Sequence, residues 1–79
     1  MLDKTRKTVR GRILLVQEER FRLLGEGGQA YLFTLSRKAA AEADDLEGWH
    51  EAGKPVMVEY EGEPNLESGV AHSVRPLYG

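Results

Sequence analysis

The sequence predicts an all-β domain: a five-stranded antiparallel barrel with one short helix between the third and fourth strands. The first observation is segment order, since three strand-like runs precede a single helical stretch and two further runs follow it. The second is Gly53, which closes the helical stretch just before Pro55 opens the next run. The third is length, because 79 residues are enough for one core and one domain.

The first strand is expected from Thr8 to Gln17. After Gly11, apolar residues occupy both odd and even positions, which face opposite sides of a strand. They are Ile13, Leu14, Leu15 and Val16. A strand shared between the two sheets of a barrel buries both faces, and a glycine within it lets the strand bend. We therefore expect both faces of this strand to become buried beyond Gly11.

The second and third strands are expected over residues 20–24 and 29–35, joined by a glycine-rich hairpin loop. A two- or four-residue loop sets Arg22 opposite Tyr31 and Arg20 opposite Phe33. Two arginines and two aromatic rings then share an outward face. A three- or five-residue loop instead places a different set of residues together in the core: Tyr31, Phe33, Leu35, Phe21 and Leu23. The sequence leaves both registers open.

The helix is expected near Asp44 to Ala52, where Leu46 and Trp49 have the spacing of one buried face and close an end of the barrel. Two strands follow, from Pro55 and from Val70. The expected core combines residues from all of these elements: Val9, Ile13, Leu15, Phe21, Leu23, Trp49, Val56, Val58 and Val74.

In this order of elements and placement of glycines the chain resembles the OB superfamily, and within it the compact single-domain bacterial members of unassigned function. The resemblance covers roughly residues 9–77. It implies an OB-like barrel over residues 8–79, preceded by a flexible basic segment over residues 1–7. It also implies that the face of the second and third strands, with its flanking loops, is the binding surface. The alternative fold is an SH3-like small barrel, in which a helical turn usually falls between the last two strands.

Charge is distributed unevenly along the chain. Residues 1–38 hold nine basic and four acidic residues, whereas residues 39–79 hold two basic and nine acidic residues. The acidic half argues against phosphate binding if Glu59 and Glu61 border the basic strands. The fold therefore decides whether this separation in sequence is also a separation in space.

The sequence carries no pattern typical of an enzyme, a metal site or a membrane protein. It contains no cysteine, and His50 and His72 have no partner at metal-ligand spacing. The glycine-rich loop precedes a strand and lacks a phosphate-binding Lys-Ser/Thr pair. No apolar run approaches the length of about 20 residues that spans a bilayer. We expect a cytoplasmic, non-catalytic protein without a cofactor, without a metal and without membrane association.

Two kinds of partner fit a small barrel of this composition. The first expectation is binding of a protein partner, or self-association. The alternative is weak binding of single-stranded nucleic acid through the face of the second and third strands, where arginines contact phosphates and aromatic rings stack on bases. The candidate ligand-binding residues are Arg20, Arg22, Tyr31 and Phe33, with Arg10 and Arg12 adding contacts.

Overall fold

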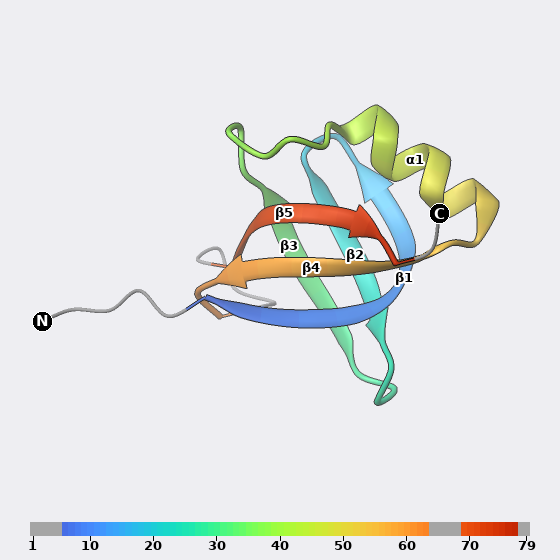
Figure 1. Ribbon diagram of the computed structural model, residues 1–79, viewed down its shortest axis with the longest axis horizontal. Helices are drawn as coiled ribbons and strands as arrows, with labels where there is room; N and C mark the ends of the chain where they lie inside the picture. Colours follow the sequence, from blue (N-terminus) through green and yellow to red (C-terminus); the bar gives the residue numbers. More distant parts are fainter. Residues whose placement is uncertain (1–5, 64–68, 78–79) are drawn as a thin grey trace, which may run out of the picture.

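The computed structural model describes residues 6–63 and 69–77 and shows a closed five-stranded barrel with one helix (Figure 1). The strands neighbour one another in the order β1-β2-β3-β5-β4. The predicted barrel, with its helix between β3 and β4, is confirmed. The elements are β1 (Lys7–Gln17), β2 (Arg20–Gly25), β3 (Ala30–Leu35), α1 (Ala43–Ala52), β4 (Pro55–Glu61) and β5 (Val70–Pro76).

One pair of neighbouring strands is parallel, which the antiparallel expectation did not include. β3 and β5 run in the same direction and pair at Thr34 with Val70 and at Leu35 with Ala71, whereas the other four pairs are antiparallel. The reason is parity. When strand direction alternates around a closed ring with an odd number of strands, one neighbouring pair must be parallel.

β1 pairs with strands on both sides of the barrel, and at Gly11 its backbone lies very close to that of β2. This residue pairs with Gly25 of β2 and with Val56 of β4. A Cβ atom built on Gly11 would lie 2.1 Å from the carbonyl oxygen of Leu24. Because no other residue fits there without moving the backbone, the predicted bend of the first strand depends on this glycine.

A β-bulge at Leu14 reverses which positions in the second half of β1 face the core. Ile13 pairs with Leu23 on the inner face, but the next paired residue, Leu15, lies opposite Arg22 on the outer face. Leu14 and Leu15 are therefore 46% and 45% exposed. The expectations that Leu15 is a core residue and that both faces of this strand become buried are wrong, because a bulge inserts one extra residue and reverses the alternation after it.

The β2–β3 hairpin adopts the register expected for a loop with an odd number of residues. Phe21 pairs with Phe33 and Leu23 pairs with Tyr31. The backbone N–H of Gly25 donates to the carbonyl of Gln29 at 2.8 Å, which leaves a loop over residues 26–28. Gly28 takes φ = 90° there, a conformation that favours glycine. The aromatic residues of β3 consequently face inward.

The core lies between the inner faces of the two sides of the barrel. Its buried residues are Ile13, Phe21, Leu23, Phe33, Leu35, Ala41, Leu46, Val56, Val58, Tyr60, Ala71 and Val74. Val9 and Trp49, which were predicted to be buried, are half-buried and pack against this cluster. Apart from Leu15, the predicted core therefore lies in or against the observed one.

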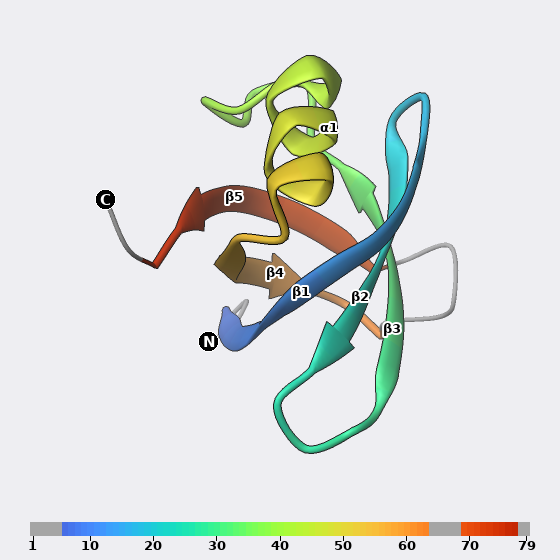
Figure 2. The ribbon, with the colours of Figure 1, turned by 90° about the vertical axis from the view of Figure 1, so that its right-hand side faces the viewer.

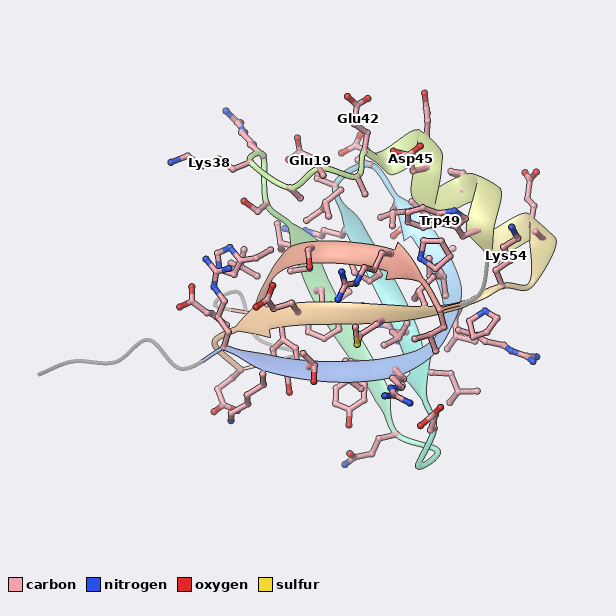
Figure 3. All side chains as sticks on the ribbon, viewed as in Figure 1. Glu19, Lys38, Glu42, Asp45, Trp49 and Lys54 are labelled. Carbon is pink, nitrogen blue, oxygen red and sulfur yellow. The ribbon has the colours of Figure 1, made fainter. Side chains whose placement is uncertain are left out.

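The helix α1 lies across one end of the barrel, where it contacts β1 (Figure 2). It begins one residue before the predicted start, and the Asp45 carboxylate accepts a hydrogen bond from the backbone N–H of Glu42 at 2.9 Å. Gly53 ends the helix with φ = 67°. Leu46 is fully buried and the half-buried Trp49 is directed toward the barrel (Figure 3).

The expected flexible segment over residues 1–7 lies mostly outside the described residues. Of its described part, Lys7 is the first residue of β1 and pairs with Tyr60. The barrel therefore begins one residue earlier than the predicted domain boundary.

Candidate binding face

Three cross-strand rows cover the outer surface of β1, β2 and β3. Each row takes one residue from each strand, and its side chains point outward because they alternate with the buried positions. The rows are Arg12-Leu24-Ala30, Leu15-Arg22-Leu32 and Gln17-Arg20-Thr34. The long side chains of these rows form what we call the leucine–arginine face: Arg12, Leu15, Gln17, Arg20, Arg22, Leu24 and Leu32.

The apolar part of this face is exposed to solvent. Leu24 is 41% exposed and Leu15 is 45% exposed, and the bulge residue Leu14 beside them is 46% exposed. Within residues 6–63 and 69–77 these are the only exposed large hydrophobic side chains. A cluster of exposed apolar side chains on a small domain is a feature of binding surfaces.

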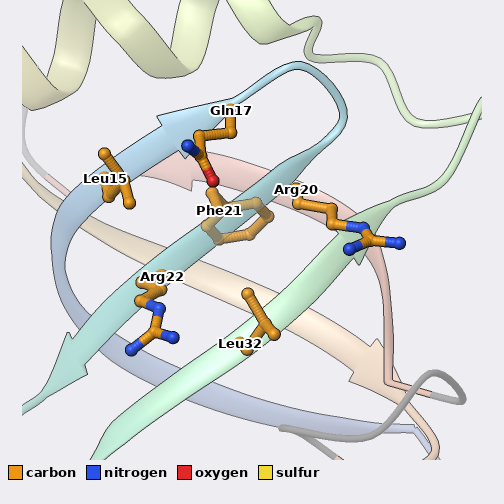
Figure 4. Close-up of a pocket in the computed structure, with 6 residues that line it drawn as sticks. All are labelled: Leu15, Gln17, Arg20, Phe21, Arg22 and Leu32. Atoms are coloured by element: carbon orange, nitrogen blue, oxygen red, sulfur yellow. The ribbon is translucent and has the colours of Figure 1, made fainter.

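Two hollows lined in part by leucines open along the leucine–arginine face, and a further hollow at Gln17, Arg20 and Thr34 is also lined by Glu18 and Glu19. The first has a volume of about 180 Å³ and is lined by Leu15, Gln17, Arg20, Phe21, Arg22 and Leu32 (Figure 4). The second has a volume of about 440 Å³ and is lined by Gly11, Arg12, Leu24, Gly25, Glu26, Pro55 and Leu77. Each of these two hollows thus combines apolar side chains with at least one arginine.

The arginines of this face have no acidic partner among the described residues. In this part of the chain an ion pair joins Arg6 Nη1 to Glu59 Oε1 at 3.8 Å, and His72 Nε2 is hydrogen-bonded to Glu61 Oε1 at 2.6 Å. The carboxylates of both contacts lie on the outer surface of β4. Glu59 and Glu61 are therefore occupied on another side of the barrel and do not border the leucine–arginine face.

Of the predicted site residues, the structure brings Arg12, Arg20 and Arg22 together. Arg10 is exposed and lies two residues before Arg12 on β1, where it pairs with Met57 of β4 and lines neither of the two hollows.

The predicted platform of arginines and aromatic rings on one face does not exist. Phe33 is 1% exposed, with its ring centroid 5.5 Å from that of Phe21 and 4.9 Å from that of Tyr60. Tyr31 is half-buried, stacks on Phe33 with centroids 6.0 Å apart, and its hydroxyl donates to Gln29 Oε1 at 3.0 Å. The hairpin register is the physical reason, because it directs both rings to the inner face.

Sequence reasoning did not identify the leucines of the face. Leu24 carried a readable signal, since it has the same parity as Arg20 and Arg22 and therefore places an apolar residue at an outward position. Leu15 carried none, because the bulge that turns it outward lies inside an uninterrupted apolar run.

Other surfaces offer less defined chemistry. A hollow lined by Arg6, Ser36, Lys38, Glu61 and His72 has mixed charge, and its Arg6 and His72 already contact carboxylates. In the described ranges no three His, Cys, Asp or Glu side chains gather in a way that could hold a metal ion. No helix in these ranges combines the length and the apolar character needed to cross a bilayer.

Comparison of the chain with known protein families, with curated proteins and with solved structures found no match. The chemistry of a ligand must therefore be inferred from the leucine–arginine face itself.

Proposed function

We propose that this chain is a non-catalytic binding module of the OB type that docks a partner protein, or a second copy of itself, through the leucine–arginine face. The single observation that carries the proposal is the exposure of Leu15 and Leu24, 45% and 41%, at outward positions of the strands that build the core. The fold does not need these side chains to be apolar, since they contribute little to its interior.

The energetics support a docking role. Fully burying a leucine side chain is worth about 1.5 to 3 kcal/mol, so covering the exposed half of each leucine contributes on the order of 1 kcal/mol to binding. Their position supports the proposal as well, because the OB superfamily commonly binds ligands on the face of its second and third strands. A cysteine-free composition is compatible with the proposed cytoplasmic setting.

The alternative function is weak binding of single-stranded nucleic acid through Arg12, Arg20 and Arg22. The observation that favours it is their lack of an acidic partner among the described residues, together with the engagement of Glu59 and Glu61 elsewhere. Burial of Phe33 weighs against it, because base stacking on aromatic rings supplies about 1 to 3 kcal/mol per base in single-strand binding.

A displayed library of randomised short peptides tests the protein-binding proposal. We expect the chain to select peptides whose binding shifts backbone amide resonances of β1, β2 and β3 in NMR spectra. A Leu15→Ser/Leu24→Ser variant should lose these ligands and keep its fold, because surface substitutions usually change stability by less than about 0.5 kcal/mol. Sedimentation velocity of the free chain, measured across concentrations, reports self-association through the same leucines.

Two results would contradict the proposal. One is the absence of any selected peptide together with a mass that does not depend on concentration. The other is a set of peptides whose amide shifts map to α1, β4 or β5, which would move the binding surface to another side of the barrel.

A further inference from the structure

We propose that the occupant of the leucine–arginine face is an acidic segment of a partner protein that also carries large apolar side chains, and whose carboxylates pair with Arg12, Arg20 and Arg22. This inference rests on the proposed function and specifies the partner's chemistry. The deciding feature is that each of the three outer rows contains one arginine.

Charge selects an acidic partner. Docking removes water from the guanidinium groups, and a charge that loses its hydration is costly unless an opposite charge replaces the water. Carboxylates are suitable replacements because a guanidinium binds them through two parallel hydrogen bonds. Glu26 lines a hollow with Arg12, and Glu18 and Glu19 line one with Arg20, but no carboxylate of the described residues forms an ion pair with these arginines, so carboxylates of a partner can bind them directly.

The two hollows indicate where apolar anchors sit. Leu15 and Leu32 contribute to the first hollow, and Leu24 contributes to the second. Arg22 and Leu24 are two residues apart on β2, which corresponds to roughly 7 Å along a strand. Apolar residues at positions i and i+4 of a helix, roughly 6 Å apart along its axis, or at positions i and i+2 of a strand match this spacing.

A second copy of the chain is a poorer occupant. Two copies that paired through this same face would set arginines near arginines, which opposes association. The exposed side of α1 is acidic through Asp44, Glu47 and Glu51, but within the described ranges no large hydrophobic residue outside β1 and β2 is exposed. The helix therefore lacks the apolar anchors that the two hollows require.

The test repeats the peptide selection with a variant in which the charge of the face is reversed, Arg12→Glu/Arg20→Glu/Arg22→Glu. We expect the unmodified chain to enrich peptides that combine Asp or Glu with Leu, Ile or Phe. The variant should bind those peptides roughly tenfold or more weakly and should enrich Lys and Arg in their place. Binding to the unmodified chain should also weaken as salt concentration rises.

The matched control changes the same net charge elsewhere, as Arg37→Glu/Lys54→Glu/Arg75→Glu. These three residues are exposed and do not belong to the face. The control should retain the acidic peptides with little change in affinity, apart from a general effect of net charge that salt suppresses. Circular dichroism of both variants verifies that the barrel is intact.

The possible outcomes distinguish failure of the acidic partner from failure of the docking function. Peptides that map to the face without enrichment of acidic residues would overturn the acidic partner and leave the docking function in place. Absence of any ligand on the face, together with a mass that does not depend on concentration, would overturn both. A labelled single-stranded oligonucleotide that binds the face more tightly than the selected peptides, and that the face variant no longer binds, would replace the protein partner with a nucleic acid.

Discussion

The inner and outer faces of the β2–β3 hairpin are built from alternating residues of the same two strands, yet their chemistry differs completely. On the inner face Phe21, Leu23 and Phe33 are 1%, 0% and 1% exposed. On the outer face the arginines and Leu24 remain in solvent. Whether a side chain contributes to the core therefore depends on which face of the strand it lies on. The core does not require the apolar residues of the outer face, which are available for binding a partner.

The largest contrast between the two faces is expected from truncation of Phe21. Phe21→Ala removes a ring that packs against Phe33 at 5.5 Å and should cost about 3 to 5 kcal/mol, a large part of the stability of a small domain. Leu15→Ala, the control on the outer face, removes a half-exposed side chain and should cost less than about 1 kcal/mol. Urea denaturation measures both free energies of unfolding. Equal losses would show that the two faces are not separated as described.

A smaller but sharper contrast compares two glycines. Gly11→Ala introduces a Cβ only 2.1 Å from the Leu24 carbonyl oxygen, so β1 and β2 must move apart at a cost of about 1 to 3 kcal/mol or more. Gly48→Ala, in α1, meets no atom within 4 Å and should stabilise the chain by about 0.5 to 1 kcal/mol. Thermal unfolding followed by circular dichroism gives the sign of each change. If Gly11→Ala left the thermal stability unchanged, β1 and β2 would be less tightly apposed at Gly11 than the structure indicates.

The elements of the fold were readable from the sequence because local signals agreed with one another. Gly53 ends the helix where a left-handed residue was expected, and Leu46 and Trp49 occupy the predicted end of the barrel. The bulge at Leu14 was not readable. In a run that is apolar at both parities, hydrophobicity does not identify which residue is the extra one, since that depends on pairing with Arg22 across the sheet.

The candidate site was predicted only in part for the same reason. Arg20 and Arg22 were predicted to share an outward face to which Arg12 adds contacts, but the predicted aromatic platform depended on a hairpin register that a glycine-rich loop sequence does not specify. The hydrogen bond from Gly25 to Gln29 fixes that register in the structure. Side-chain identity thus indicated the charge of the face, whereas long-range pairing determined its apolar content.

The smallest expected effect concerns a buried titratable residue of the inner face, Tyr60, whose ring centroid lies 4.9 Å from that of Phe33. Burial raises the pKa of the Tyr60 hydroxyl, and the neighbouring Tyr31 and Glu63 act in the same direction. The folded chain therefore keeps the phenolic proton to higher pH than the unfolded chain does. Its contribution to stability is complete below the ordinary tyrosine pKa of about 10 and is lost as pH rises through the raised value.

Tyr60→Phe keeps the ring and removes the proton, so the variant should lose less stability than the parent between about pH 9 and about pH 11 while matching it near neutral pH. Urea denaturation at a series of pH values measures the slope of unfolding free energy against pH. Glu63→Gln serves as a second variant, because removing one of the smaller causes of the shift should reduce the slope without abolishing it. If the parent and Tyr60→Phe lost stability in parallel, the alkaline transition would arise outside the inner face.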